Sequence, residues 1–449
     1  MKKWLYIPIE TKVRELDAKI LLACAAAQKD FNIIIARKAE LSRYISILPP
    51  GIFLAYGGQE NFAPFYKRLT EYGHTVIGMD EEGLVRFHDI KYCALKLSQK
   101  SLQYMRMFLS WGKDHGKVIQ NFTRDSSNLE VCDVGNLRFD LLRAELRGKI
   151  DEQAQNLKKE HGKIILINSN MGAHNHYLGR EKYFASLKTK KVILNSEDER
   201  FYGTWLDLQK NLYESYIDVL PELSRAFPEH IIVIRPHPSE DKSRWESISK
   251  NLDNVKVIYE GNVHPWITAA DVLIHGFCTT PLEGFALDTP LIAYRPFKNN
   301  DIENEIPFLG SYEATTATEL IKAIQTILGH NYKMADKSLL KPYIQNINGT
   351  YAYENILNTI EPHASRQVKT LPYLKLRYRY FRHVVTTIVN RLFNKRTKNE
   401  DYTDHKFPDF TKDDIRNGEQ NLQKIFTDYK EVSITKIDPF CYMISSGHN

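Results

Sequence analysis

A chain of 449 residues is too long for one ordinary hydrophobic core and suits two domains with a further segment. With 43% hydrophobic residues, 26% charged residues and a net charge of +6, its composition excludes a disordered chain and gives no reason to expect a nucleic-acid-binding protein. The five cysteines are odd in number and lack metal-binding spacing, which favours free thiols in a reducing compartment.

The N-terminus and the apolar runs bear on localisation. The first apolar run meets Glu10 too early for a signal peptide. No apolar run approaches the roughly 18–20 residues of a membrane span. We therefore expect a cytoplasmic protein that is at most peripheral to the inner membrane.

Strand-like and helical patterns alternate through the first 330 or so residues. The predicted strands of the first half are Trp4–Ile9, Asn32–Ile35, Ile52–Tyr56, Thr75–Met79, Phe108–Trp111 and Leu129–Val134. Those of the second half are Ile164–Asn168, Ile231–Ile234, Val255–Tyr259, Val272–His275 and Leu291–Tyr294, with long helices over Asp198–Ala226 and Ala317–Leu328. Such alternation predicts α/β domains with parallel sheets covered by helices on both faces.

The polar segment Arg147–Lys163 marks the crossing between two domains. We predict two doubly wound, Rossmann-like domains that face each other across a cleft, over 1–155 and 156–335. A mostly helical tail is expected over 336–449.

The tail contains a basic segment, Leu371–Lys398, with eight Lys or Arg and no acid among aromatic residues. This composition is typical of a helix that lies on an anionic membrane surface. It is equally compatible with a helix that packs on the core and keeps its basic groups in water. Nucleic-acid binding is a weaker option, because no recognised motif accompanies the charge.

The segment Ile231–Glu240 runs from a buried strand into Arg235 and His237, each followed by a proline. A residue before proline is held in extended geometry, and ligands of open parallel sheets bind at the carboxyl ends of the strands. We expect Arg235, His237 and Pro238 to contact a phosphorylated, nucleotide-linked substrate.

A second candidate is HGFCTTPLEG, which follows the strand Val272–His275. Thr280 fits an N-cap, Pro281 the first helical position and Glu283 the acid of a capping box. The amide groups of a helix start favour an anion, and the hydroxyls of Thr279 and Thr280 add donors. Glu283 either caps this helix or accepts hydrogen bonds from ribose.

An acidic turn, Asp80-Glu81-Glu82-Gly83, follows the strand Thr75–Met79. Repulsion between adjacent carboxylates is expected to raise at least one pKa toward that of a general base. The alternative is an ordinary solvated turn.

Two less specific loops complete the set of candidates. Arg138 lies in GNLRFD, a cleft loop or a structural turn, and Asn170 lies in a polar loop that holds a sugar or its own backbone. No D-x-D sequence provides for a metal that bridges a diphosphate.

Together the acidic turn, the His237-Pro238 pair and the Thr279-Thr280 pair resemble the motif set of bacterial sialyltransferases, polysialyltransferases and Kdo transferases of the GT-B fold. The opening WLYIPIETKVRELDAK, the runs GNLRFDLL, IRPHPSE and HGFCTTPLEG, and FPDFTKDDI near the end more closely resemble the bacterial surface carbohydrate biosynthesis protein family.

The resemblance implies a glycosyltransferase that uses a CMP-activated ulosonic acid, such as Kdo or sialic acid, and a lipid-linked or oligosaccharide acceptor. It implies Glu82 as the general base and His237, Thr279 and Thr280 as CMP ligands, with no cofactor or metal required. The extra acid, Asp80, departs from the pattern, so Asp80 or Glu81 are alternative catalytic residues. The stereochemistry stays open, because some related Kdo transferases are thought to use a carboxylate nucleophile.

Two other functions are compatible with these patterns. One is another enzyme of similar fold, either a polyol-phosphate transferase using CDP-glycerol or a UDP-sugar epimerase. The other is a non-catalytic, membrane-associated scaffold of polysaccharide assembly.

Overall fold

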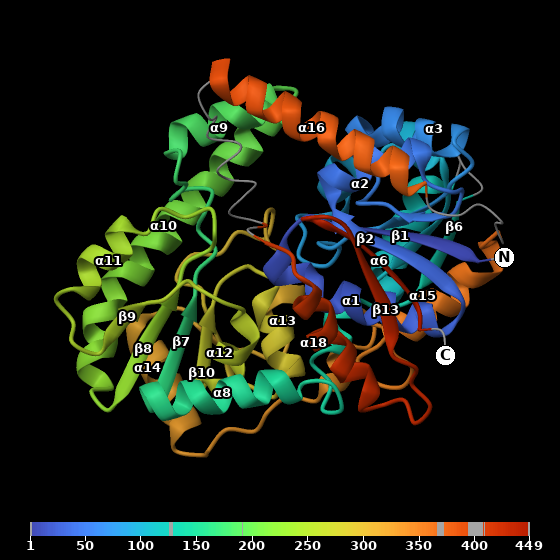
Figure 1. The fold of residues 1–449 in the computed structure, drawn as a ribbon. Coiled ribbons are helices and arrows are strands. Elements are labelled where there is room, and N and C mark those ends of the chain that lie inside the picture. Colours follow the sequence, from blue (N-terminus) through green and yellow to red (C-terminus); the bar gives the residue numbers. More distant parts are fainter. Residues whose placement is uncertain are drawn as a thin grey trace. The chain divides into compact units, whose positions relative to one another are not determined.

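The computed structural model describes residues 2–124, 129–190, 192–365, 372–393, 407 and 409–447 (Figure 1). The chain forms two compact units. Unit 1 consists of Met1–Gly83, Lys96–Leu146 and Pro342–Asn449, and unit 2 of Leu84–Leu95 and Arg147–Lys341.

Unit 1 is built on an eight-stranded sheet with the order β13-β14-β2-β1-β3-β4-β5-β6. The strands are β1 (Lys3–Ile9), β2 (Phe31–Arg37), β3 (Ile52–Leu54), β4 (Thr75–Met79), β5 (Met105–Ser110), β6 (Glu130–Asp133), β13 (Val432–Asp438) and β14 (Cys441–Ser446). Strands β1 to β6 are parallel, whereas β14 pairs antiparallel with β2 and β13. Every residue of β1 is buried, as expected of a strand inside a sheet covered on both faces.

The helices of unit 1 include α1, which packs against both sheet and tail because its apolar and alanine residues bury most of its surface. Its α-helices are α1 (Lys12–Gln28), α2 (Lys38–Tyr44), α3 (Ala63–Glu71), α5 (Gln99–Leu102), α6 (Lys113–Thr123), α7 (Leu137–Asp140), α15 (Ala352–Ile360), α16 (Tyr373–Phe393) and α18 (Lys412–Gln423). Short 3-10 turns lie at Ile45–Ile47, Glu60–Phe62 and Glu361–His363.

Unit 2 contains a six-stranded parallel sheet with the order β12-β11-β10-β7-β8-β9. Its strands are β7 (Lys163–Asn168), β8 (His230–Arg235), β9 (Val255–Val257), β10 (Val272–His275), β11 (Leu291–Tyr294) and β12 (Tyr312–Ala314). Its α-helices are α4 (Asp89–Lys96, whose last residue belongs to unit 1), α8 (Gly148–His161), α9 (Arg180–Thr189), α10 (Ser196–Ala226), α11 (Ser243–Ser249), α12 (Val263–Ala269), α13 (Thr280–Ala286) and α14 (Ala317–Leu328). Short 3-10 turns lie at Ile306–Phe308 and Lys337–Leu340.

Each sheet has a point at which the strand order reverses. In unit 1, β1 lies between β2 and β3; in unit 2, β7 lies between β8 and β10. The two doubly wound, Rossmann-like domains predicted from the sequence are therefore confirmed. The carboxyl ends at these two points are where ligands of such sheets bind.

The C-terminal region differs from the separate, mostly helical tail predicted over 336–449. Residues from Pro342 onward join unit 1, and β13 and β14 extend its sheet. Buried Asp140 fixes the connection: its carboxylate accepts hydrogen bonds from Asn346 Nδ2 (2.7 Å) and from the amides of Ala352 (2.8 Å) and Tyr353 (2.9 Å), at the start of α15. Of the basic segment 371–398, residues 371 and 394–398 lie outside the described residues.

The predicted boundary near residue 155 is closer to residue 146, and residues 84–95 make an excursion into unit 2. Phe87 explains the excursion. Its ring lies 5.2 Å from that of Phe201 and 5.3 Å from that of Trp205, centroid to centroid. Phe87 is partly buried against the core of unit 2, and this aromatic packing holds the segment on the second unit.

Candidate functional site

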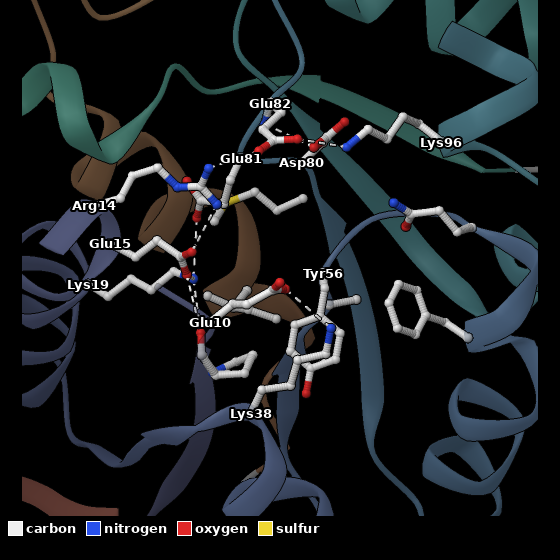
Figure 2. Close-up of a pocket in the computed structure, with 16 residues that line it drawn as sticks. Glu10, Arg14, Glu15, Lys19, Lys38, Tyr56, Asp80, Glu81, Glu82 and Lys96 are labelled. Atoms are coloured by element: carbon white, nitrogen blue, oxygen red, sulfur yellow. Dashed lines mark hydrogen bonds and ion pairs between the residues drawn. The ribbon is translucent and has the colours of Figure 1, made fainter. Parts of the chain in front are cut away.

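Unit 1 contains a cavity of about 260 Å³ at the carboxyl ends of β1, β2, β3 and β4, which we call the unit 1 cavity (Figure 2). It lies where the strand order reverses. Its charged and aromatic lining consists of Glu10, Arg14, Glu15, Lys19, Lys38, Tyr56, Phe62, Asp80, Glu81, Glu82 and Lys96. The acidic turn predicted from the sequence therefore lies at a ligand-binding position of the fold.

The acidic turn is held in shape by its first residue. Asp80 is buried, and its Oδ1 accepts a hydrogen bond from the amide of Glu82 (2.9 Å). The backbone carbonyl of Asp80 accepts from Trp111 Nε1 (2.6 Å). These contacts give Asp80 a positioning role, and they leave Glu81 and Glu82 as the acids that line the cavity with more exposed carboxylates.

Two neighbours hold the rest of the turn. Arg138, predicted to bind the nucleotide sugar, belongs to unit 1, where its Nη2 donates to the carbonyl of Glu81 (3.3 Å). Gly83 is required by close packing, since a Cβ there would lie 2.4 Å from Cε1 of His115. Arg138 thus supports the backbone of the acidic turn, and its contact with a nucleotide sugar stays a prediction.

Glu82 lies between two cations, Arg14 and Lys96 (Figure 2). Its carboxylate accepts hydrogen bonds from Arg14 Nη1 (2.8 Å) and Lys96 Nζ (3.0 Å). Burial alone would raise the pKa of Glu82, but the charges of Lys96 and Arg14 outweigh it and hold that pKa well below its usual range. The expectation that repulsion raises a pKa in the turn does not hold for Glu82, which stays ionised.

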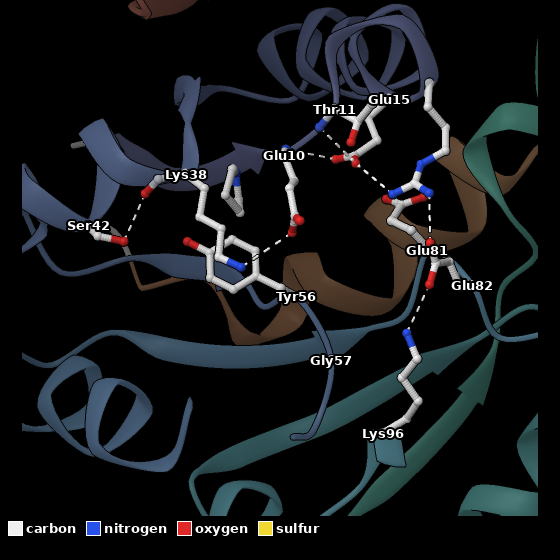
Figure 3. Close-up of polar contacts among 12 residues, drawn as sticks. Glu10, Thr11, Glu15, Lys38, Ser42, Tyr56, Gly57, Glu81, Glu82 and Lys96 are labelled. Atoms are coloured by element: carbon white, nitrogen blue, oxygen red, sulfur yellow. Dashed lines mark hydrogen bonds and ion pairs between the residues drawn. The ribbon is translucent and has the colours of Figure 1, made fainter. Parts of the chain in front are cut away.

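Glu81 belongs to a second, more buried charge cluster. Lys19 Nζ lies 3.3 Å from Glu81 Oε1 and 2.8 Å from Glu15 Oε2. Glu15 also accepts from the amides of Glu10 and Thr11 (Figure 3). Burial opposes ionisation of Glu15, yet Lys19 and Arg14 lower its pKa to about 2. The cluster therefore keeps Glu15 charged although its carboxylate is buried.

The opposite part of the cavity is aromatic. Lys38 Nζ lies 4.0 Å from the ring centroid of Tyr56 and 4.5 Å from that of Phe62, and 3.4 Å from Glu10 Oε2. Carboxylates that accept from hydroxyl groups, beside aromatic faces that stack on C–H surfaces, suit a polyhydroxylated ligand such as a sugar.

The sequence did not single out Glu10, Arg14, Lys19, Lys38, Tyr56 and Lys96. The available signal was Lys19, a charge within the apolar run of α1, because a buried Lys needs a partner. Which acid it pairs with depends on the strand order.

In unit 2 the buried carboxylate of Glu240 organises the loops after β7 and β8. Its Oε1 accepts from Ser169 Oγ (2.7 Å) and from the amides of Met171 (3.1 Å) and His237 (3.1 Å), and its Oε2 accepts from Trp245 Nε1 (3.1 Å). Glu240 ends the RPHPSE run but was not singled out from the sequence. It fixes the backbone on which His237 stands.

His237 is exposed at the end of β8, and so is Pro238. Its Nδ1 accepts from the amide of Ser239 (3.2 Å) and lies 2.7 Å from Ser239 Oγ. The neutral imidazole therefore carries its proton on Nε2. Gly172 permits this packing, because a Cβ there would lie 2.1 Å from Ser239 Oγ.

Arg235 requires a correction. Its guanidinium donates to four backbone carbonyls in the loop after β9, those of Ile258 (3.4 Å), Tyr259 (3.5 Å), Glu260 (3.0 Å) and Gly261 (2.9 Å). Burial lowers its pKa to about 10. These carbonyls accept from the guanidinium N–H groups that were expected to bind phosphate, so Arg235 is a structural residue.

The remaining candidates lie at the same edge of the unit 2 sheet. Asn170 Nδ2 donates to the carbonyl of Phe277 (2.7 Å), which joins the loops after β7 and β10. Helix α13 begins at Thr280 with Thr279 as N-cap, one residue earlier than predicted, and both side chains are half-buried. The carboxylate of buried Glu283 lies 3.3 Å from Nε2 of His264.

Comparisons with known proteins identify the fold. No family model and no curated protein matches the chain. A protein described as a UDP-N-acetylglucosamine 2-epimerase from Listeria monocytogenes is similar with a TM-score of 0.52 and 14% identity, over 81% of this chain and 96% of that chain. The UDP-GlcNAc 2-epimerase from Methanocaldococcus jannaschii is similar with a TM-score of 0.50 and 12% identity, over 81% of this chain and 100% of that chain. These similarities establish an architecture of two Rossmann-like domains.

Proposed function

We propose that the protein is an enzyme of nucleotide-activated sugars, a glycosyltransferase in which unit 2 binds the nucleotide and the unit 1 cavity binds a sugar. The observation that carries the proposal is the position of Glu81 and Glu82, two acids that line one cavity with Tyr56 and Phe62 at the carboxyl ends of β1 to β4. His237 after β8 and Thr279 and Thr280 after β10 lie at the carboxyl edge of the unit 2 sheet, and they support a nucleotide monophosphate there, because imidazole, hydroxyl and amide groups all donate to phosphate oxygens.

In finer detail we propose a CMP-activated ulosonic acid as donor and a lipid-linked or oligosaccharide acceptor of surface polysaccharide. Glu82 would accept the proton of the acceptor hydroxyl. It has the more exposed carboxylate of the two acids, 52% against 19% for Glu81. The lowered pKa keeps the Glu82 carboxylate ionised, so it can accept a proton, although a carboxylate with a low pKa is a weak base. The absence of a metal requirement for transfer remains a prediction.

Release of CMP from CMP-Kdo and CMP-sialic acid, with and without an acceptor oligosaccharide, tests the proposal. Glu82→Gln should abolish release while CMP still stabilises the protein in a thermal shift assay; Glu71→Gln, an exposed acid of unit 1, is the control. His237→Ala should weaken the CMP-dependent shift, with His88→Ala, an exposed histidine of unit 2, as its control. Equal loss of CMP binding and turnover in Glu82→Gln would contradict the assigned roles.

The comparisons favour a second candidate, epimerisation of a UDP-N-acetylhexosamine, because both similar structures are described as UDP-GlcNAc 2-epimerases. The nucleotide distinguishes the two candidates. A larger thermal shift with UDP than with CMP, together with appearance of the 2-epimer in proton NMR of a UDP-GlcNAc incubation, would establish epimerisation. Absence of any turnover with all of these donors would instead favour the scaffold role.

A further inference from the structure

A second cavity of unit 1, of about 420 Å³, is lined by Arg43 of α2 and by Arg379, Arg382, His383 and Thr386 of α16. We call it the arginine pocket. Neither the candidate sugar site nor the nucleotide loops use any of these residues. Three guanidinium groups around one hollow mark a site for an anion, since guanidinium binds phosphate oxygens through paired N–H groups.

The pocket is built by hydrogen bonds between α16 and the segment around α2. Arg379 Nη1 donates to the carbonyl of Arg43 (2.9 Å) and to Ser46 Oγ (2.7 Å), which fixes the helix in place. Arg43 Nη2 donates to His383 Nε2 (3.0 Å). Burial and the charge of Arg43 lower the pKa of His383, so the imidazole is neutral and its Nε2 can accept this hydrogen bond.

Two described acids, Glu40 and Asp438, lie near enough to act on His383. Asp438 accepts hydrogen bonds from Tyr44 Oη (2.6 Å) and from the amide of Phe440 (2.8 Å). Glu40 lies 3.5 Å from Arg43 Nη2, but its carboxylate accepts at 2.7 Å from both Nε and Nη2 of Arg37. Because Glu40 is engaged mainly by Arg37, the charges of Arg379 and Arg382 are not balanced by it. The described part of α16 up to Thr386 carries four Lys or Arg and no acid.

Beside the pocket, α16 exposes an apolar stripe. Leu374 is 84% exposed, Tyr378 61%, Phe381 64% and Val385 42%. The spacing i, i+4, i+7, i+11 places these four side chains on one face of the helix. The pocket residues Arg379, Arg382, His383 and Thr386 have the spacing i, i+3, i+4, i+7, which places them together on the neighbouring face. A stripe this exposed on one helix marks an interaction surface.

We propose that the arginine pocket binds the phosphate headgroup of an anionic phospholipid while the apolar stripe of α16 enters the interfacial region of the bilayer. Charge complementarity selects this partner, because apolar and basic faces lie side by side on a helix without acids. No described helix is long and apolar enough to cross a membrane, and α16 carries charges along its length, so it lies on the surface. The basic segment predicted from the sequence thereby gains a specific headgroup site, and this inference does not depend on the proposed sugar transfer.

Vesicle sedimentation of the full chain tests the inference, using phosphatidylcholine vesicles with and without 30% phosphatidylglycerol. Arg382 and Arg377 form a matched pair, because helical periodicity places them on opposite flanks of the apolar stripe and both are exposed. Loss of one charge near an anionic surface weakens binding about fivefold. We expect Arg377→Gln to weaken vesicle binding by about this factor. Arg382→Gln should bind the vesicles at least tenfold more weakly than Arg377→Gln. Equal losses in the two variants would overturn the pocket, because diffuse attraction alone would then explain binding.

A second variant tests the apolar stripe without changing charge. Leu374→Ser with Phe381→Ser should abolish sedimentation with anionic vesicles; both side chains are exposed, so the thermal melting temperature should not change. Unchanged vesicle binding in this variant would overturn the membrane surface. Equilibrium dialysis with sn-glycerol 3-phosphate distinguishes a soluble ligand from a lipid. The proposal would also be overturned if the protein bound this compound but did not sediment with anionic vesicles.

Discussion

Arg14, in the first turn of α1, and Glu82, after β4, are joined by a hydrogen bond of 2.8 Å. The bond links two segments that lie 68 residues apart in the chain, and Lys96 completes the pair from the other side at 3.0 Å. The acidic turn is therefore one end of a charge network that crosses the unit 1 cavity.

Removal of Lys96 should raise the pKa of Glu82. Lys96→Gln takes away the cation whose charge contributes most to the low pKa of Glu82, while burial, which raises that pKa, is unchanged. A carboxyl-carbon NMR titration of protein labelled in glutamate measures the change. Lys100→Gln is the control, because Lys100 pairs with exposed Glu60 at 2.7 Å. An unchanged pKa in Lys96→Gln would mean that Arg14 alone holds Glu82 ionised.

Loss of Lys19 should destabilise unit 1. Lys19→Met leaves Glu15 buried without its nearest cation, and breaking such a buried pair costs about 3 kcal/mol. The double variant Glu15→Gln with Lys19→Met should recover part of this loss, which urea denaturation at pH 7 measures. In the parent the pKa of Glu15 is lowered to about 2, so its contribution to the free energy of unfolding is complete above about pH 4.5 and is lost as the pH falls toward 2.

Buried His275 should make unit 2 sensitive to mild acid. Burial lowers its pKa to about 4, and its Nε2 lies 2.8 Å from Ser311 Oγ. Because the folded state binds the proton less tightly than the unfolded state, this contribution is complete above about pH 6.5 and is lost as the pH falls through 4. His275→Gln should remove about 3 kcal/mol of the decline in unfolding free energy over this range. His88→Gln should leave the decline as it is in the parent.

Asp140 should hold the C-terminal region on unit 1. Asp140→Ala removes the acceptor of three hydrogen bonds and leaves their buried donors without it, at a cost of about 3 kcal/mol. Limited proteolysis should then cut the chain in the segment just before α15, where the chain returns to unit 1, faster than in the parent. Asp17→Asn, which changes an exposed acid of α1, should leave the cleavage rate unchanged. Equal rates in Asp140→Ala and the parent would show that apolar packing alone holds the region.

Local patterns predicted the sheets well and the site only in part. Thr75–Met79, Val272–His275 and Leu291–Tyr294 have the predicted bounds, because each is a short apolar run between turn residues. The role of Arg235 could not be predicted, since the carbonyls that occupy its guanidinium belong to a loop more than twenty residues away. Strands β13 and β14 were missed because β13 alternates polar residues and has few fully buried side chains.

The same limit applies to the unit 1 cavity. Arg14 and Lys38 reach it only because β1 pairs with both β2 and β3, and this order is not encoded in any one segment. The acidic turn was predictable from its position directly after a strand. The low pKa of Glu82 was not predictable, because it depends on two cations, Arg14 of α1 and Lys96.

Strand β14 covers the edge of β2 with hydrogen bonds that pair Ile444 with Ile33 and Cys441 with Ala36. During synthesis this edge stays open until β14 (Cys441–Ser446) has left the ribosome, although β2 (Phe31–Arg37) emerges much earlier. An uncovered apolar edge strand readily pairs with other chains. Shortened products that end before β14 are therefore expected to accumulate as aggregates, and a folded first domain will not be recovered by expressing the N-terminal third alone.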